Sequence, residues 1–351
     1  MKNLTICHVN LAKGFRGGER QTELLIKHLS DSVAAQYLVC RRNSPLVEHL
    51  KDVKNLTAVE VSGRFGGHFS NIRADIINVH EAKAAHWALI EHTLRGTPYV
   101  ITRRVPQKIK KGVLSNLCYS RASRLVGISS PITEYLKEIS SRPVVTINSA
   151  LAHMSCDLQK TSSILNEYQN KIIIGHIGAY VDRHKGQRII IEAARQLAKE
   201  RDDLVFLCLG AGCDEQVLRE ESCDVPSVKW LGFQKDVGSY LKAFRLFVFP
   251  SRNEGLGSTL LDVMDYGIPV IASNVDGIPD IVKDYQTGLL IENGSATQLA
   301  EKIRELLNDS ELAGRLAHNA KSSLENFLPE TMASRYIDMY QSILQEGEHN
   351  R

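Results

Sequence analysis

The stretch SRNEGLGSTLLDVMDYGIPVIAS, residues 251–273, combines a carboxylate, glycines and a helix start in a spacing that suits anion binding. An apolar strand is expected to end at Pro250, and a loop with Glu254 and Gly255 leads to a helix that begins near Ser258. The free N–H groups and the positive dipole end of such a helix favour an anion such as a diphosphate. The stretch therefore predicts a phosphate-binding loop.

Two carboxylates flank this loop and suggest a second kind of ligand group. Asp262 lies eight residues after Glu254, one turn into the expected helix, where it could bind a neutral diol such as a ribose. Glu254 could bind the hydroxyls of a sugar, and Gly257 would let the backbone approach the anion closely. The same residues also fit an ordinary strand, loop and helix with an acidic first turn, so they leave both interpretations open.

Short apolar runs alternate with helical segments on both sides of this loop. In the first half the expected strands cover 4–9, 36–40, 56–61, 75–80, 98–102, 124–129 and 144–149. In the second half they cover 171–178, 204–210, 228–232, 246–251, 269–273 and 287–292. Strands separated by helices are typical of parallel sheets covered on both faces, so the pattern predicts an α/β fold.

A polar stretch at 151–170 interrupts the alternation, and a new strand begins at Lys171. We interpret it as a linker between two Rossmann-like parallel-sheet domains, residues 1–160 and 161–328, with a helical segment at 329–351. Two such domains are expected to face each other across a cleft, and ligands bind beyond the carboxyl ends of the strands. The residues directly after each strand are therefore the candidate site residues.

Composition and charge exclude several classes of protein. Hydrophobic residues make up 43% and charged residues 24% of the chain, which is typical of folded domains and not of a disordered chain. The formal net charge of +3 is too small for a dedicated nucleic-acid binder. No apolar run approaches the ~18 residues of a membrane helix, and the first residues are too polar for a signal peptide. Seven scattered cysteines without a C-x-x-C pattern favour reduced thiols in a cytoplasm.

The pattern E-G-x-G-x-x-x-x-[D/E], followed by G-x-P-V-I-A, resembles the E-x7-E signature of family-4 glycosyltransferases of the GT-B fold. The segments 230–251 and 275–309 resemble the family on both sides of the signature. The similarity covers essentially all of 171–330 and is looser in the first half. It implies a retaining enzyme of two Rossmann-like domains, in which the helix 329–351 crosses back to the first domain.

The resemblance assigns roles to the residues of the loop. Glu254 would contact the transferred sugar of a nucleotide-sugar donor, and Asp262 would hold the ribose. The family more often has Glu at the second position, and Asp is one methylene shorter. The diphosphate would be wrapped by the backbone N–H groups of Gly255, Leu256, Gly257, Ser258 and Thr259.

The segment HIGAYVDRHKGQ, residues 176–187, places Arg183 and Lys185 before a helix. In the family a basic pair here neutralises the donor diphosphate, whose negative charge grows as the glycosidic bond breaks. Lys185 matches the family, but the usual Arg position holds Ala179, so Arg183 is expected to substitute for it. The alternative is a solvated basic helix start, which the helix dipole disfavours.

Three further candidates lie in the first half. Gly17 and Gly18 stand after the first strand, where the family has a similar pair in a loop over the donor phosphates, although Gly-Gly alone fits a simple turn. His80 ends the fourth strand, where the family often has a histidine close to the sugar; a lone histidine there is more often structural. Arg103 begins the basic segment 103–112 and is the expected acceptor contact.

The same basic segment also contains Arg104, Lys108, Lys110 and Lys111. It could attract a phosphorylated acceptor or an anionic membrane, or it could be a solvated loop.

In the second half, Gly210 and Gly212 are followed by Glu215 where a dinucleotide fingerprint requires a third glycine. This argues against a NAD-dependent oxidoreductase and indicates a tight turn instead. Phe233 is expected near the donor base. No D-x-D occurs, so we expect neither a bound metal nor a cofactor besides the donor substrate.

Together these features predict a metal-independent glycosyltransferase that moves a sugar from a nucleoside-diphosphate sugar to a hydroxyl of a glycan or lipid-linked acceptor. Glu254, His80, Arg183 and Lys185 would be its catalytic residues. By family habit the setting is bacterial surface polysaccharide or lipopolysaccharide synthesis, in the cytoplasm and at the inner face of the plasma membrane. The alternative is a catalytically impaired relative that only binds the nucleotide sugar.

Overall fold

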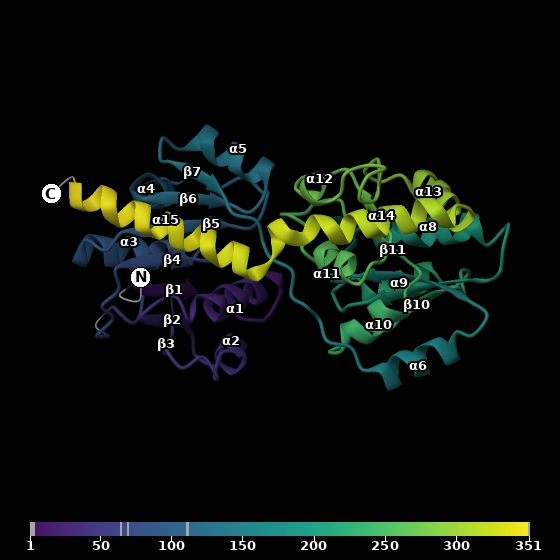
Figure 1. Ribbon diagram of the computed structural model, residues 1–351, viewed down its shortest axis with the longest axis horizontal. Coiled ribbons are helices and arrows are strands. Elements are labelled where there is room, and N and C mark those ends of the chain that lie inside the picture. Colours follow the sequence, from purple (N-terminus) through teal and green to yellow (C-terminus); the bar gives the residue numbers. More distant parts are fainter. Residues whose placement is uncertain (1–3, 64, 69, 110–111, 350–351) are drawn as a thin grey trace. The chain divides into compact units, whose positions relative to one another are not determined.

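The structure, a computed structural model, describes residues 4–63, 65–68, 70–109 and 112–349. It divides into two compact units (Figure 1). Unit 1 contains the residues up to Ala152 together with those from Asn326 onward, and unit 2 runs from His153 to Glu325. Lys110 and Lys111 of the basic segment lie outside the described residues.

Unit 1 is built on one parallel sheet, with the strand order β3-β2-β1-β4-β5-β6-β7 among the described residues. Its strands are β1 (Thr5–Asn10), β2 (Ala35–Arg41), β3 (Leu56–Val61), β4 (Ile76–Val79), β5 (Tyr99–Arg103), β6 (Arg124–Gly127) and β7 (Val144–Thr146). The central strands β4 and β5 are buried along their whole length. This burial explains why both strands are mainly apolar, because helices cover both faces of such a sheet, and their buried polar residues Asn78 and Thr102 find hydrogen-bond partners within unit 1.

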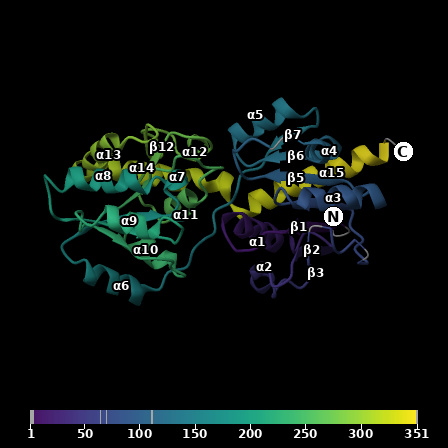
Figure 2. The same ribbon diagram turned by 180° about the vertical axis from the view of Figure 1, so that it is seen from behind.

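The helices of unit 1 are α1 (Gly17–Leu29), α2 (Pro45–His49), α3 (Ala84–Arg95), α4 (Val113–Arg121), α5 (Ser130–Ile139) and α15 (Pro329–His349). The C-terminal helix α15 packs against α1, and Figures 1 and 2 show it in yellow across unit 1. Two buried tyrosines of α15 make polar contacts with the sheet. The Asn78 amide donates to the Tyr340 hydroxyl at 2.7 Å, and the Tyr336 hydroxyl lies 2.9 Å from that of Thr102. These bonds join α15 to β4 and β5.

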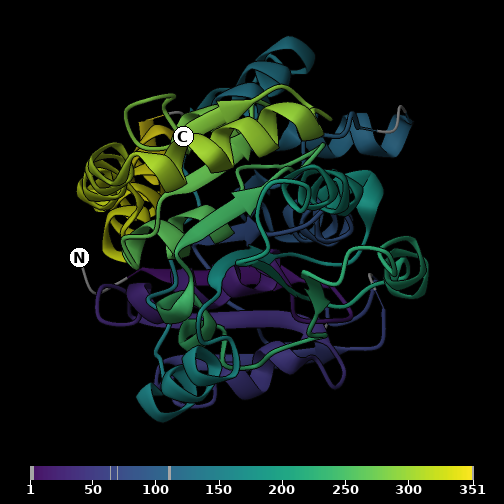
Figure 3. The same cartoon turned by 90° about the vertical axis from the view of Figure 1, so that its right-hand side faces the viewer.

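Unit 2 has a second parallel sheet, with the order β10-β9-β8-β11-β12-β13 among the described residues. Its strands are β8 (Ile172–Ile177), β9 (Leu204–Leu209), β10 (Val228–Trp230), β11 (Leu246–Phe249), β12 (Val270–Ser273) and β13 (Leu289–Ile291). Its helices are α6 (Leu158–Glu167), α7 (Asp182–Lys185), α8 (Gln187–Leu197), α9 (Glu215–Glu221), α10 (Val237–Ala243), α11 (Thr259–Asp265), α12 (Ile278–Ile281), α13 (Ala296–Asn308) and α14 (Ser310–Ser322), and a 3-10 turn (Ser323–Phe327) follows. Figure 3 shows helices on either side of the green strands.

The two-sheet Rossmann-like fold predicted from the sequence is confirmed, and every expected strand is present. The polar stretch 151–170 differs from the expectation of a plain linker, because it contains α6, which packs on α10 in unit 2. Asp157 caps this helix by accepting from the N–H of Gln159 at 2.8 Å. Within the described part of the chain, we find no helix of the length and apolarity required to cross a membrane.

Candidate functional site

A close approach between two turns positions Lys185 in unit 2. Gly186 ends the short helix α7 with a φ of +67°, which L-residues adopt only with strain. A Cβ atom at Gly186 would lie 2.1 Å from the carbonyl oxygen of Pro250, the residue directly after β11. The glycine therefore lets the turn after α7 touch the end of β11, where the loop with Glu254 begins.

The Glu254 carboxylate is the centre of the contacts in this part of unit 2. Its Oε1 accepts a hydrogen bond from the Lys185 ammonium and another, at 3.0 Å, from the Ser251 hydroxyl. The backbone N–H of Glu254 donates to Oδ2 of Asp276 at 2.8 Å. Lys185 also lies over the Phe249 ring, 5.1 Å from its centre. The structure thus brings Lys185 and Glu254 together as a half-buried ion pair, with side-chain exposures of 21% and 13%.

The loop after Glu254 presents a run of unused backbone donors. None of the N–H groups of residues 255–259 donates a hydrogen bond within the described part of the chain. Gly257 has a φ of +84°, so the loop requires a glycine there. Helix α11 is only seven residues long, and its dipole is correspondingly small. Anion binding here must therefore depend mainly on the free N–H groups and on Lys185.

Asp262 lies in the first turn of α11 and is buried, at 8% exposure. Arg183 and Ala179 are both exposed, and Arg183 makes no hydrogen bond or ion pair with any other described residue. The structure therefore leaves the Arg183 guanidinium available to a ligand but does not hold it in place.

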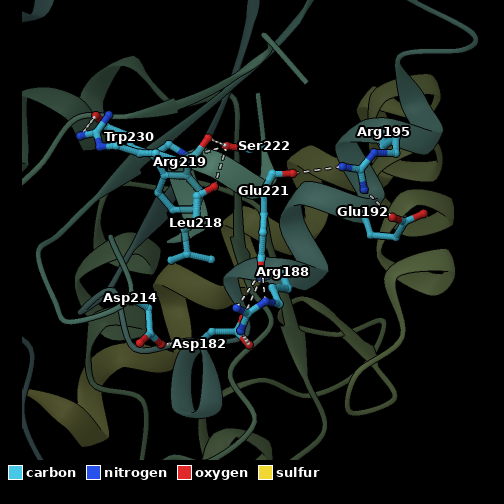
Figure 4. A network of polar contacts seen from close by, with 10 residues as sticks. All are labelled: Asp182, Arg188, Glu192, Arg195, Asp214, Leu218, Arg219, Glu221, Ser222 and Trp230. Atoms are coloured by element: carbon cyan, nitrogen blue, oxygen red, sulfur yellow. Dashed lines mark hydrogen bonds and ion pairs between the residues drawn. The ribbon is translucent and has the colours of Figure 1, made fainter. Parts of the chain in front are cut away.

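An ion-pair network, drawn in Figure 4, holds α7 against α8 and α9. Asp182 accepts the backbone N–H of Arg188 at 2.8 Å and its guanidinium at 3.0 Å. Arg188 also pairs with Glu221 at 2.7 Å, and Asp214 accepts the N–H of Asp182 at 2.8 Å. These bonds fix the start of the turn that carries Lys185.

The expected tight turn after β9 is present. A Cβ at Gly210 would lie 1.9 Å from the carbonyl oxygen of Gly178, and one at Gly212 would lie 2.2 Å from that of Tyr180. Phe233, after β10, is 72% exposed, so its ring is open to a ligand.

In unit 1, a chain of hydrogen bonds orients His80, which is 3% exposed. The Gln36 amide donates to the Ile26 carbonyl at 3.0 Å, so its oxygen faces Nε2 of His8 at 3.1 Å. His8 must then carry its proton on Nε2 and accept on Nδ1, which lies 3.0 Å from Nε2 of His80. It follows that His80 is protonated on Nε2 and has a free lone pair on Nδ1.

The environment keeps this histidine pair neutral. Burial lowers the pKa of His80 well below its usual value, and its electrostatic interactions with His8 and Arg104 lower it further. Burial likewise lowers the pKa of His8 to about 4. Nδ1 of His80 has no hydrogen-bond partner among the described residues, so it can accept from a ligand hydroxyl.

The two arginines after β5 differ in their surroundings. Arg103 is buried: its guanidinium donates to the Gln107 carbonyl, lies 3.4 Å from the Tyr119 hydroxyl and packs over the Tyr135 ring. Its Nη1 and Nη2 atoms are used within unit 1, whereas its buried Nε has no hydrogen-bond partner among the described residues, and its role as an acceptor contact stays a prediction. The Arg104 side chain instead lies next to Gly18, in the first turn of α1. A Cβ atom added at Gly18 would lie 3.8 Å from Cδ of Arg104.

Sequence reasoning missed the residues that act by contact. His8, Gln36 and Asp276 were not named, because their partners lie far along the chain, and Arg104 was named only as one member of the basic segment. Only Ser251, three residues before Glu254, had a local signal.

Comparison with known proteins finds similarity to glycosyltransferases, and the family match lies in unit 2. Residues 158–323 match the family model described as glycosyl transferases group 1. The capsular polysaccharide biosynthesis glycosyltransferase CapM of Staphylococcus aureus is 28% identical over 195 residues, 54% of this chain and 50% of its own length. An uncharacterised glycosyltransferase of Methanocaldococcus jannaschii is 25% identical over 312 residues, 85% of this chain and 84% of its own. The match to CapM thus spans about half of that relative.

Solved structures share the whole fold. A glycosyltransferase from Rickettsia africae superposes with a TM-score of 0.85 at 18% identity, over 98% of this chain and 99% of its own. Anabaena HepE in complex with UDP-glucose gives 0.82 at 18% identity, over 97% and 100%. The chain therefore has the GT-B fold, and the match to the family model lies within residues 158–323.

Proposed function

We propose that the protein is a glycosyltransferase that moves a sugar from a nucleoside-diphosphate sugar to a hydroxyl of an acceptor. The observation that carries this proposal is the Lys185–Glu254 pair beside the unused N–H groups of residues 255–259, inside the matched segment. A cation and a row of N–H groups suit a diphosphate. A carboxylate beside them suits the hydroxyls of the attached sugar.

The donor would be divided among these groups. Lys185, with Arg183 as a second cation, would bind the diphosphate together with the N–H groups of the loop. Oε1 of Glu254 is used by Lys185 and Ser251, whereas Oε2 makes no hydrogen bond with any described residue and would accept from a sugar hydroxyl. Asp262 would hold the ribose, and Phe233 would lie near the base.

Unit 1 would supply the remaining groups. We propose that His80 accepts a hydrogen bond from the transferred sugar or from the acceptor through Nδ1, and that the loop with Gly17 and Gly18 closes over the donor phosphates and the acceptor. In the transfer step the acceptor oxygen forms a bond to C1 of the sugar while the bond from C1 to the phosphate oxygen breaks. The acceptor proton moves to the leaving phosphate, on the face from which it departs, so the anomeric configuration is retained. Lys185 stabilises the charge that the diphosphate gains.

The named relatives suggest the substrates. They include a lipopolysaccharide core biosynthesis glycosyltransferase of Rhizobium meliloti and the N-acetyl-alpha-D-glucosaminyl L-malate synthase of Bacillus anthracis. Anabaena HepE has been solved with UDP and with UDP-glucose, so UDP-sugars are the first donors to try. We propose a role in glycan or glycolipid assembly in the cytoplasm, with peripheral contact to an anionic membrane through the basic segment that starts at Arg103.

A thermal-shift screen against UDP, GDP, ADP and NAD tests the proposal. A ligand at ~100 times its dissociation constant stabilises the folded chain by about 2.7 kcal/mol, so a true ligand gives a clear shift. We expect one nucleoside diphosphate to stabilise the chain and NAD not to. Stabilisation by NAD alone would contradict the proposal.

Turnover distinguishes an active enzyme from an impaired relative. With the sugar form of the stabilising nucleotide, we expect donor hydrolysis that Glu254→Ala lowers at least 100-fold and that the control Glu301→Ala, at an exposed position on α13, leaves unchanged. Equal, negligible rates in the wild type and in Glu254→Ala would show a protein that only binds the donor.

A further inference from the structure

We propose that unit 1 binds an acceptor that carries a phosphate or a carboxylate, and that Arg104 is the residue that binds this anion. The term acceptor rests on the function proposed above, whereas the anion site itself rests on unit 1 alone.

The guanidinium of Arg104 is enclosed and largely unpaired. Its Nε and Nη2 atoms have no contact with solvent and no hydrogen-bond partner within the described ranges. Nη1 has one long contact, 3.5 Å to the Ser149 hydroxyl. No carboxylate among the described residues forms an ion pair with it. The Glu19 carboxylate acts on its charge without forming an ion pair, and it accepts the Arg16 N–H at 2.9 Å.

A cation held in this way has few contacts that offset its loss of hydration. Burial lowers the pKa of Arg104, and its electrostatic interactions with Tyr336 and Glu19 oppose this shift only in part. Buried charges in proteins are paired or bind ions, because an isolated charge loses its hydration without compensation. Groups kept at such a cost cluster at functional sites. The missing partner of Arg104 is therefore expected to be an anionic ligand.

Other unused polar groups lie at the same edge of the sheet. Strand β5 leads to Arg104, and its neighbours β4 and β6 lead to His80 and Ser129. Nδ1 of His80 and the Ser129 hydroxyl are buried and have no hydrogen-bond partner among the described residues. The N–H of Gly18, at the start of the 13-residue helix α1, is also unused within the described chain and lies next to the Arg104 side chain. Cations, N–H groups and a hydroxyl together favour an anion.

The combination also restricts the ligand class. Arg104 and Gly18 require a negative group, whereas Nδ1 of His80 can only accept and so requires a hydroxyl or another donor. A ligand with both groups is a hydroxy acid or a phosphorylated polyol, either free or as the head group of a lipid. Arg103 is less available, because its Nη1 and Nη2 atoms already contact Tyr119 and Gln107 and only its Nε has no partner among the described residues.

A phosphate titration tests the anion site without any knowledge of the donor. We would follow the thermal midpoint in inorganic phosphate against chloride at equal ionic strength, in a Lys185→Gln background that mutes the donor site. Phosphate is expected to raise the midpoint of Lys185→Gln by several degrees. Addition of Arg104→Gln should remove most of that rise, whereas Arg104→Lys should keep part of it and the control Arg121→Gln, at an exposed position at the end of α4, should keep it. Equal rises with and without Arg104→Gln would overturn the proposal.

Stability without phosphate excludes a merely structural role. Because Arg104→Gln removes an unpaired buried charge, its midpoint in chloride should equal or exceed that of the parent. A midpoint several degrees lower would show that Arg104 supports the fold, and would overturn the proposal.

A transfer assay identifies the source of the anion. With the donor from the nucleotide screen, we would compare glycerol with glycerol 3-phosphate and L-malate, and phosphatidylcholine vesicles with phosphatidylglycerol vesicles. Product is expected only from anionic acceptors, and the productive arm separates a free compound from a lipid. Transfer to glycerol as fast as to glycerol 3-phosphate would contradict the proposal. If no nucleotide binds, the proposed function fails, but the phosphate titration still decides the role of Arg104.

Discussion

Substitution of Gly186 tests whether the turn after α7 positions Lys185. Gly186→Ala places a methyl group against the carbonyl oxygen of Pro250 and against Ile189. Gly267→Ala is the matched control, because Gly267 has nearly the same φ, +68°, in unit 2, and nothing lies within 4 Å of its Cβ position.

The structure gives the size of the difference. In Gly267→Ala the only penalty is that alanine must adopt a left-handed backbone conformation. The lower conformational entropy of the unfolded variant offsets part of this penalty, so the free energy of unfolding should fall by about 1 kcal/mol. At Gly186 the new Cβ would lie 2.1 Å from the oxygen, whereas ordinary contacts begin at 3.4 Å. Relief of this overlap should cost about 1–3 kcal/mol more, so Gly186→Ala should cost about 2–4 kcal/mol in total.

Urea denaturation followed by circular dichroism measures both losses, and titration calorimetry with the stabilising nucleotide measures the effect on binding. We expect Gly186→Ala to weaken binding and Gly267→Ala to leave it unchanged. Equal losses of stability in the two variants, or full nucleotide affinity in Gly186→Ala, would refute the contact between the α7 turn and the end of β11.

Three further changes have defined outcomes. Lys185→Gln should weaken nucleoside diphosphate binding about 10- to 100-fold, because it removes a charge-assisted hydrogen bond of ~1.5–3 kcal/mol. The control Lys199→Gln, at an exposed position, should leave the affinity unchanged. Equal affinities of Lys185→Gln and the wild type in calorimetry would contradict this prediction. Burial lowers the pKa of His176 to about 4, so the unfolded chain binds the proton more readily and stability falls as pH drops from 6.5 to 4, by up to about 1.4 kcal/mol per unit. Denaturant titrations at pH 7 and pH 5 should show a smaller fall in His176→Gln, and an unchanged fall would disprove the assignment. Gln36→Leu removes the acceptor that fixes the His8 tautomer, so nitrogen NMR should show mixed His8 tautomers, whereas one tautomer in both proteins would rule out the relay.

The sequence predicted the strands well, because a strand buried on both faces requires a continuous apolar run. Strand β9 (Leu204–Leu209) is such a case, and its residues are all buried. Helix α6 was missed because only Thr161 and Ile164 of its residues are buried, so its apolar period is weak. Its cap, Asp157, was the one local signal.

The site was predictable only where chemistry follows local spacing. Glu254 and the glycine loop lie together in the sequence. Lys185 could be added to the predicted site only because its segment resembles the glycosyltransferase family. The partner that orients Glu254, Asp276, lies 22 residues later, and the carboxylate could be placed there only by the fold. The choice between Arg103 and Arg104 depends on which way each side chain leaves the end of β5, which spacing does not encode.

A crystal structure with the nucleotide sugar chosen by the thermal screen tests the central claim most directly. We predict the diphosphate within hydrogen-bond distance of the Lys185 ammonium and of the N–H groups of residues 255–259, and a sugar hydroxyl on Oε2 of Glu254. A nucleotide bound elsewhere on the chain, with the Lys185–Glu254 pair and the loop N–H groups untouched, would contradict the account.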